Sequence, residues 1–187
     1  MSGEEQLREQ LTALYTALRG ETRERWARDL PLDELLSDRW ERARSLGFGE
    51  GSSIYASGLV YGEVEVGAKT WIGPFTLLDG SGGLRIGQNC SISAGVQIYT
   101  HDTVKWALSG GQAEYDRAPV DIADCCHVGA QSVVAKGVTI GPHSVVGACS
   151  FVNRDLPAYT VAAGVPCRRI GHVEVADDGA VEIVMDG

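Results

Sequence analysis

The stretch DIADCCHVGAQSVVAKGVTIGPHSVVGACSFV, residues 121–152, decides the fold of this 187-residue chain. An aliphatic residue returns at every sixth position, and a small or β-branched residue follows four places after each of the first five. The aliphatic positions are Ile122, Val128, Val134, Ile140, Val146 and Val152. A helix repeats about every 3.6 residues and a strand every two, so neither element alone produces this spacing. A fixed period of six indicates a parallel β-helix.

The same period runs through the preceding part of the chain. It passes through one row of aliphatic residues, slips by two positions, and continues in a second row: Val60, Val66, Ile72, Leu78 and Leu84, then Ile86, Ile92 and Ile98. Three hexapeptides make one triangular coil, in which each aliphatic side chain points inward from a short strand. The small residue four places later fills the corner. We therefore predict an all-β solenoid, a parallel β-helix of hexapeptide repeats, over residues 51–171.

The repeat is interrupted once, by YTHDTVKWALSGGQAEYDRAPVD at residues 99–121. Ile98 and Ile122 are 24 residues apart, which is four hexapeptide lengths. The positions that would continue the inward row are Val104, Gly110 and Asp116, and these do not form a consistent row. Residues 99–121 are therefore predicted to form an extruded loop, and the paired glycines at 110 and 111 allow it to bend.

The two ends of the chain have different patterns. Leucines recur at helical spacing over residues 3–30, and a second helical pattern follows Pro31 and ends near residue 46. At the other end, VEVADDGAVEIV (residues 173–184) alternates around an Asp-Gly pair, which predicts a β-hairpin. We expect a helical segment over 1–50 and a hairpin over 172–187. A stacked solenoid needs such caps, because its open ends leave strand edges unpaired.

Composition excludes several classes of protein. The formal net charge of −9 argues against nucleic acid as the main partner. No apolar run reaches the roughly 18 residues that span a bilayer, and the acidic start MSGEEQLREQ is no secretory signal. The five cysteines are odd in number and lack C-x-x-C spacing, so neither a disulfide framework nor a zinc site is expected. These observations favour a soluble, cytoplasmic protein without a membrane partner.

The chain resembles the hexapeptide-repeat acyltransferases over about Ser53–Ile170. Three features carry the resemblance: the six-residue repeat, the YTHD that opens the loop, and the closing AAGVPCRRI at residues 162–170. The maltose and galactoside O-acetyltransferases are most similar, with the polysaccharide and nucleotide-sugar acetyltransferases. This resemblance implies a left-handed β-helix, a homotrimer with active sites between neighbouring subunits, and acetyl-CoA as co-substrate.

The expected chemistry needs a base that removes the proton of an attacking hydroxyl, and a neutral imidazole suits that task. His101 follows the inward Ile98 by three residues, where the family places its catalytic histidine, so the resemblance implies that it is the general base. Asp102 follows directly and is a candidate to orient the ring. Asp79, in LLDGSGG, is a candidate to bind the acceptor or to pair with the histidine, although Asp-Gly is also a common turn.

Two further groups complete the expected site. Trp106 and Tyr115 are the candidate acceptor contacts of the loop, since aromatic faces suit sugar rings as well as subunit interfaces. The resemblance also implies coenzyme contacts, through the backbone of three residues and the side chains of two arginines. These residues are Ala130, Ala148, Asn153, Arg154 and Arg168. His127 stands where related enzymes often have an aromatic residue, so it either shapes the acceptor pocket or is an exposed coil residue.

The resulting hypothesis is an acetyl-CoA-dependent O-acetyltransferase that acts on a sugar or nucleotide-sugar hydroxyl. An N-acetyltransferase acting on an amino-sugar amine remains an alternative, because an amine nucleophile also needs a base. A carbonic anhydrase-like zinc enzyme is less favoured. Its family sets two histidines five residues apart, and no pair among His101, His127, His143 and His172 has that spacing. We therefore expect no metal. A non-catalytic scaffold would leave the loop histidine and the basic residues unexplained.

Overall fold

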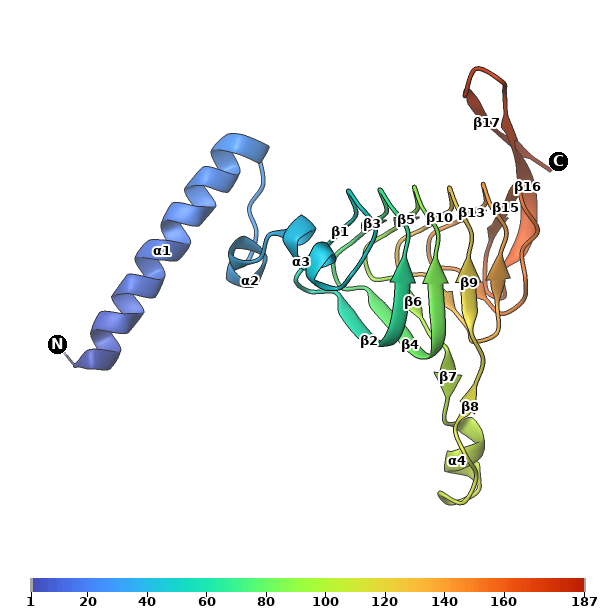
Figure 1. Cartoon of the computed structure of the whole chain (residues 1–187), viewed down its shortest axis with the longest axis horizontal. Coiled ribbons are helices and arrows are strands. Elements are labelled where there is room, and N and C mark those ends of the chain that lie inside the picture. The colour runs from blue at the N-terminus through green and yellow to red at the C-terminus, as the bar shows by residue number, and fades with distance from the viewer. Residues whose placement is uncertain (1, 187) are drawn as a thin grey trace. The chain divides into compact units, whose positions relative to one another are not determined.

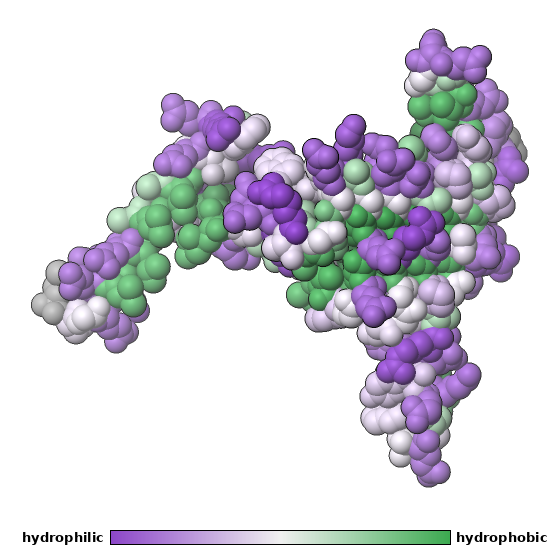
Figure 2. Space-filling model, viewed as in Figure 1, coloured by the Kyte–Doolittle hydropathy of each residue, from purple (hydrophilic) through white to green (hydrophobic). Residues whose placement is uncertain are grey.

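The computed structural model describes residues 2–186, and the chain divides into two compact units, residues 1–38 and 39–187. The first unit holds α1 (Gly3–Trp26) and α2 (Leu32–Leu36). A capping box starts α1: the Ser2 hydroxyl accepts from the Glu5 backbone N–H, and the Glu5 carboxylate accepts from the Ser2 backbone N–H. Leu7, Leu11 and Leu14 of α1 are exposed, and hydrophobic side chains line the helix in Figure 2.

The second predicted helix is not continuous. It is divided into α2 and α3 (Arg39–Ser45), with Ser37 in an extended conformation between them. The prediction was wrong at this point because Ser and Asp, here Ser37 and Asp38, favour caps and turns over helix interiors. The helix α3 is in the same compact unit as the β-strands, where its Ala43 joins the buried core.

The strands form a parallel β-solenoid, as the repeat predicts (Figure 1). Its coils stack into three walls. Wall one contains β1 (Ser53–Ile54), β3 (Trp71–Ile72), β5 (Ser91–Ile92), β10 (His127–Val128), β13 (Val145–Val146) and β15 (Thr160–Ala163). Wall two contains the first halves of β2 (Leu59–Val66) and β4 (Leu77–Ile86), then β6 (Gln97–Ile98), β11 (Val133–Val134) and β14 (Phe151–Val152). Wall three contains the second halves of β2 and β4, then β9 (Val120–Ile122) and β12 (Thr139–Ile140).

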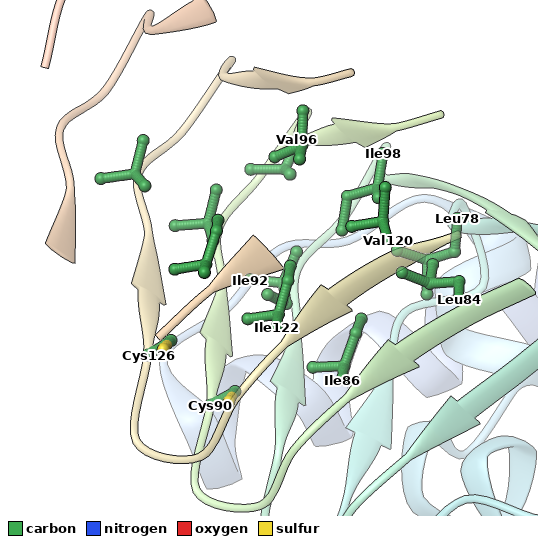
Figure 3. Close-up of a cluster of buried hydrophobic side chains, with 14 of the residues drawn as sticks. Leu78, Leu84, Ile86, Cys90, Ile92, Val96, Ile98, Val120, Ile122 and Cys126 are labelled. Atoms are coloured by element: carbon green, nitrogen blue, oxygen red, sulfur yellow. The ribbon is translucent and has the colours of Figure 1, made fainter. Parts of the chain in front are cut away.

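The inward aliphatic side chains of successive coils lie one above another and form the core. The isoleucines at 54, 72, 92, 98, 122 and 140 have an exposed fraction of 0%. Figure 3 shows part of this column, with Cys90 and Cys126 at the small corner positions of two coils. The six-residue period therefore predicted the core correctly, because each repeat points one aliphatic side chain into the interior of the coil.

The pairing of residues between neighbouring strands shows where the repeat is irregular. Ile54 pairs with Ile72, 18 residues later, which is one regular coil. Leu78 pairs with Ile98, 20 residues later, because β4 carries a bulge: Gly62 pairs with Gly80, but Val64 pairs with Leu84. This bulge is the physical form of the two-residue slip in the sequence. Gly80 is required beside it, since a side chain there would meet the backbone of Glu63.

The solenoid ends in an antiparallel hairpin of β16 (Arg168–Val175) and β17 (Val181–Met185). The strand β16 pairs with β15, so the hairpin extends wall one beyond the last coil (Figure 1). The pairing of β16 with β17 begins at Gly171, one residue before the expected start at residue 172, and the preceding residues of β16 pair only with β15. No helix among residues 2–186 is long and apolar enough to cross a membrane.

Candidate active site

The extruded loop is built on a short two-stranded ribbon (Figure 1). It contains β7 (His101–Asp102), α4 (Val104–Leu108) and β8 (Asp116–Arg117), and the chain rejoins wall three at Val120. The two strands are antiparallel, with His101 opposite Arg117 and Asp102 opposite Asp116. Since neighbouring residues of a strand point to opposite faces, the ribbon has one face with His101 and Arg117 and another with the two aspartates.

His101 is held by a buried carboxylate. Its Nδ1 lies 2.6 Å from Oδ2 of Asp79, whose side chain is 2% exposed. Asp79 comes from the bulged strand β4, one coil before the loop. The same Oδ2 accepts from the backbone N–H of Thr100 at 2.9 Å, and Oδ1 accepts from the backbone N–H of Ser81 at 3.0 Å. The bulge and the root of the loop together fix this pair.

These contacts determine the protonation of the pair. Burial alone would raise the pKa of Asp79, but the hydrogen bonds from Ser81, Thr100 and His101 outweigh it and hold this pKa well below its usual range. Asp79 is therefore ionised at neutral pH. An ionised carboxylate only accepts, so Nδ1 of His101 carries a proton. In the neutral ring, Nε2 then presents a lone pair, and no other group of residues 2–186 bonds to it.

The structure brings some predicted residues to His101 and not others. Tyr115 stacks on the imidazole with ring centroids 6.3 Å apart, and Trp106 meets Tyr115 edge-on at 5.8 Å. Asp102 does not contact the ring: its Oδ1 accepts from the backbone N–H of Val104. Asp79 pairs with the histidine and is buried, so it offers no surface to an acceptor. Of the three readings considered for Asp79, the geometry agrees with pairing and also with a turn, because its Oδ1 accepts from the backbone N–H two residues on.

A lysine of the solenoid holds the other face of the ribbon. Nζ of Lys136 lies 3.2 Å from Asp102 and 3.3 Å from Asp116. Asp102 and Asp116 are directly opposite in the ribbon, and like charges so placed repel each other. Hydrogen bonds with both carboxylates outweigh partial burial and raise the pKa of Lys136. Lys136 thus neutralises the aspartate face and fastens the loop to the coil after β11.

Removing this clamp is expected to loosen the loop. In Lys136→Met, amide hydrogens of residues 100–118 should exchange about three to ten times faster, because two opposed carboxylates lose their shared cation. Hydrogen-exchange mass spectrometry measures this directly. Lys136→Arg should keep most of the protection, and Lys105→Met, which removes a 71% exposed partner of Asp116, should have a smaller effect. Unchanged exchange in Lys136→Met would contradict a clamp.

The residues expected to contact coenzyme lie at two different corners of the solenoid. Asn153 and Arg154 follow β14 and stack beneath the corner from which the loop leaves, because β6, β11 and β14 are neighbours in wall two. Ala130 and Ala148 precede β11 and β14, at the opposite edge of that wall; the backbone N–H of Cys149 donates to the carbonyl of Ala130. Arg168 opens β16 and is exposed.

Sequence reasoning overlooked three groups at this site: Ser81, Thr100 and Lys136 as a ligand of the loop. Lys136 is the only Lys or Arg between Arg117 and Arg154, and a lone cation in so long a stretch is a signal that it has a partner. His127 is exposed on wall one. Within the described chain, no group of three His, Cys, Asp or Glu side chains is arranged to hold a metal ion.

The comparison with known families agrees with the repeat of the coil. Residues 119–154 match the bacterial transferase hexapeptide family, described as having six repeats. The resemblance to the hexapeptide-repeat acyltransferases is thereby confirmed. Residues 119–154 lie in the part of the solenoid that follows the loop, where the six-residue period is unbroken.

Three other proteins are similar to this chain in sequence or in structure. The galactoside O-acetyltransferase of Escherichia coli K12 is 28% identical over 60% of this chain and 65% of its own length. A 2,3,4,5-tetrahydropyridine-2,6-dicarboxylate N-acetyltransferase of Staphylococcus aureus Newman is 33% identical over 52% of this chain. The chain spans only 37% of that enzyme. The crystal structure of a hexapeptide-repeat acetyltransferase from Vibrio cholerae O1 biovar eltor, complexed with acetyl coenzyme A, has a TM-score of 0.59 at 28% identity. The match covers 91% of this chain and 90% of the Vibrio cholerae chain.

Proposed function

We propose that this protein is an acetyl-CoA-dependent acetyltransferase that moves the acetyl group to a hydroxyl of a sugar or nucleotide sugar. The observation that carries the proposal is the Asp79–His101 pair, fixed at the root of a loop on a hexapeptide solenoid. A buried, ionised carboxylate on Nδ1 leaves Nε2 as an accessible base. The named acetyltransferases among the similar proteins support the same class of reaction.

In this reaction His101 acts first as base and then as acid. Nε2 takes the proton of the acceptor hydroxyl while the hydroxyl oxygen attacks the carbonyl carbon of the thioester. The tetrahedral intermediate then collapses, the carbon–sulfur bond breaks, and Nε2 returns the proton to the departing sulfur. The products are an acetyl ester and the free thiol of coenzyme A. Asp79 holds the ring in its tautomer and stabilises the imidazolium that forms between these steps.

A homotrimer, which the family resemblance implies, is part of the proposal. The separation of the two halves of the site in one chain supports an assembly of copies placed side by side. His101, Asn153 and Arg154 share one edge of wall two, whereas Ala130 and Ala148 lie at the other edge. Two copies placed side by side bring the loop edge of one next to the Ala130 edge of its neighbour. The pantetheine arm then binds backbone groups along the coils, and Arg154 and Arg168 meet phosphate oxygens.

Transfer to an amine is the second candidate. The similarity to an N-acetyltransferase of Staphylococcus aureus favours it, and His101 serves an amine nucleophile equally well. The two candidates share the coenzyme, the base and the geometry of attack. They differ only in the atom of the acceptor that is acetylated.

Release of the coenzyme thiol tests the proposal. The protein is incubated with acetyl-CoA and a panel of sugars, amino sugars and nucleotide sugars, and thiol is followed with a chromogenic reagent. We expect acceptor-dependent release, and mass spectrometry of the product should show an added acetyl group on oxygen or on nitrogen. Calorimetry should show saturable acetyl-CoA binding. The absence of binding at millimolar acetyl-CoA would rule out the acetyltransferase.

A further inference from the structure

Arg117 differs from the other cations of the loop region. It lies directly opposite His101 in the ribbon, so the two side chains leave the same face. Lys105 and Lys136 are both bonded to aspartates of the loop region. The Arg117 guanidinium makes neither an ion pair nor a hydrogen bond with any group of residues 2–186. Its one recorded contact is with the ring of Tyr115, 5.7 Å from the centroid.

A cavity opens beside this arginine. It has a volume of about 290 Å³, and its lining includes Trp106, Gln112, Glu114, Tyr115 and Arg117. Tyr115 forms a wall of the cavity and also stacks on His101. The cavity therefore adjoins the histidine through a shared ring and combines aromatic faces, an amide and an unpaired cation. Glu114 is the opposing charge in the lining, and it is not bonded to Arg117.

We propose that the acceptor is an anionic sugar, whose carboxylate or phosphate group binds Arg117 while its ring packs against Trp106 and Tyr115. This inference rests on the proposed acetyl transfer at His101, since it identifies the acceptor of the same site. A guanidinium is suited to the role because it donates two parallel hydrogen bonds to a carboxylate or phosphate. The chain as a whole carries a net charge of −9, so attraction of an anion has to come from a local, unneutralised cation.

The phosphates of coenzyme A are another anionic group that could bind Arg117. The experiment therefore distinguishes an anionic sugar from the coenzyme. Binding of three hexose probes is measured by calorimetry without acetyl-CoA: an uncharged hexose, a hexuronate and a hexose 1-phosphate. Acetyl-CoA is titrated in a separate arm. The variants are Arg117→Gln, Arg117→Lys and Glu114→Gln. The matched control is Arg85→Gln, which removes an arginine paired with Asp121 on wall three.

For the wild type, we expect the anionic hexoses to bind about tenfold or more tightly than the uncharged hexose. Arg117→Gln should abolish that difference, Arg117→Lys should restore part of it, and Glu114→Gln should strengthen anion binding. Arg85→Gln should match the wild type. Acetyl-CoA affinity should stay within about twofold in all four variants.

Three results would overturn the inference. One is equal binding of charged and uncharged hexoses by the wild type, or no saturable binding of either anion. Another is an unchanged preference for anions in Arg117→Gln. The third is a loss of acetyl-CoA affinity in Arg117→Gln with sugar binding intact, which would assign the arginine to the coenzyme. The thiol-release assay tests the proposed acetyl transfer separately from these binding measurements. A negative result in that assay would count against the proposed function, whereas the results above would count only against the acceptor class.

Discussion

His101→Ala should lower the turnover number by about 10²- to 10⁴-fold, the range that a positioned general base contributes. Affinity for acetyl-CoA should stay close to the wild-type value, because none of the expected coenzyme contacts involves the imidazole. Steady-state thiol release gives the turnover number, and calorimetry gives the dissociation constant of acetyl-CoA. The structural reason for so large an effect is that Nε2 is the one open nitrogen of a ring that Asp79 already holds at Nδ1.

The matched control for this variant is His143→Ala. His143 lies between β12 and β13, at the corner that carries neither the loop nor the Ala130 edge, and it stacks on Tyr159. Its removal should leave the turnover number within about twofold of the wild type. Retention of full turnover by His101→Ala would show that another group removes the proton. An equal loss in both variants would show that the effect is not specific to the loop histidine.

Asp79→Asn should lower the turnover number by about 10²- to 10⁴-fold while the fold and the Michaelis constant for acetyl-CoA stay near wild type. Asparagine has nearly the same shape, but it is neutral and carries an N–H₂ group on one side. It cannot stabilise the imidazolium by charge. It also cannot accept from Ser81, Thr100 and His101 with two oxygens as the carboxylate does. The pH profile of the turnover number should change with it, because the charge beside the ring is lost.

Asp102→Asn is the control that distinguishes the two aspartates near the histidine. Asp102 bonds the backbone of Val104 and the ammonium of Lys136, so its neutralisation should change turnover by less than about tenfold. Thermal unfolding should be compared for both variants, since the buried Asp79 also ties β4 to the root of the loop. If Asp79→Asn unfolds, Asp79→Glu provides a charged variant in which the carboxylate is misplaced but not removed. Wild-type turnover in a folded Asp79→Asn would contradict the pairing mechanism.

The solenoid was predictable because its rule is local and repeated. Each inward position, such as Ile92 or Ile140, must hold a buried aliphatic side chain. Many residues therefore indicate the same fold independently. The two-residue slip and the extruded loop were visible as departures from that rule. The break at Ser37 was missed because the apolar residues on either side, such as Leu36 and Trp40, keep a helical spacing even where the backbone is extended.

The partner of His101 could be suggested but not decided from the sequence. Asp79 and His101 are 22 residues apart, and a regular coil separates stacked residues by 18. Only the bulge in β4 and the exit of the loop after Thr100 bring the two side chains together. The Lys136 clamp depends on contacts across 34 and 20 residues, to Asp102 and Asp116, which no local pattern encodes. Such contacts depend on how the loop folds back, and the period of the coil contains no information about that.

The pairing across the loop has an evolutionary consequence. Ile98 pairs with Val134, 36 residues later, and Val134 pairs with Val152 after a further 18, so the coils above and below the excursion remain in one register. The excursion is thus an interchangeable module: its length and sequence can drift while the scaffold folds unchanged, since the entropy of closing a loop grows only slowly with its length. Under the proposed function, changes confined to this segment would alter the acceptor and leave the histidine at its root in place.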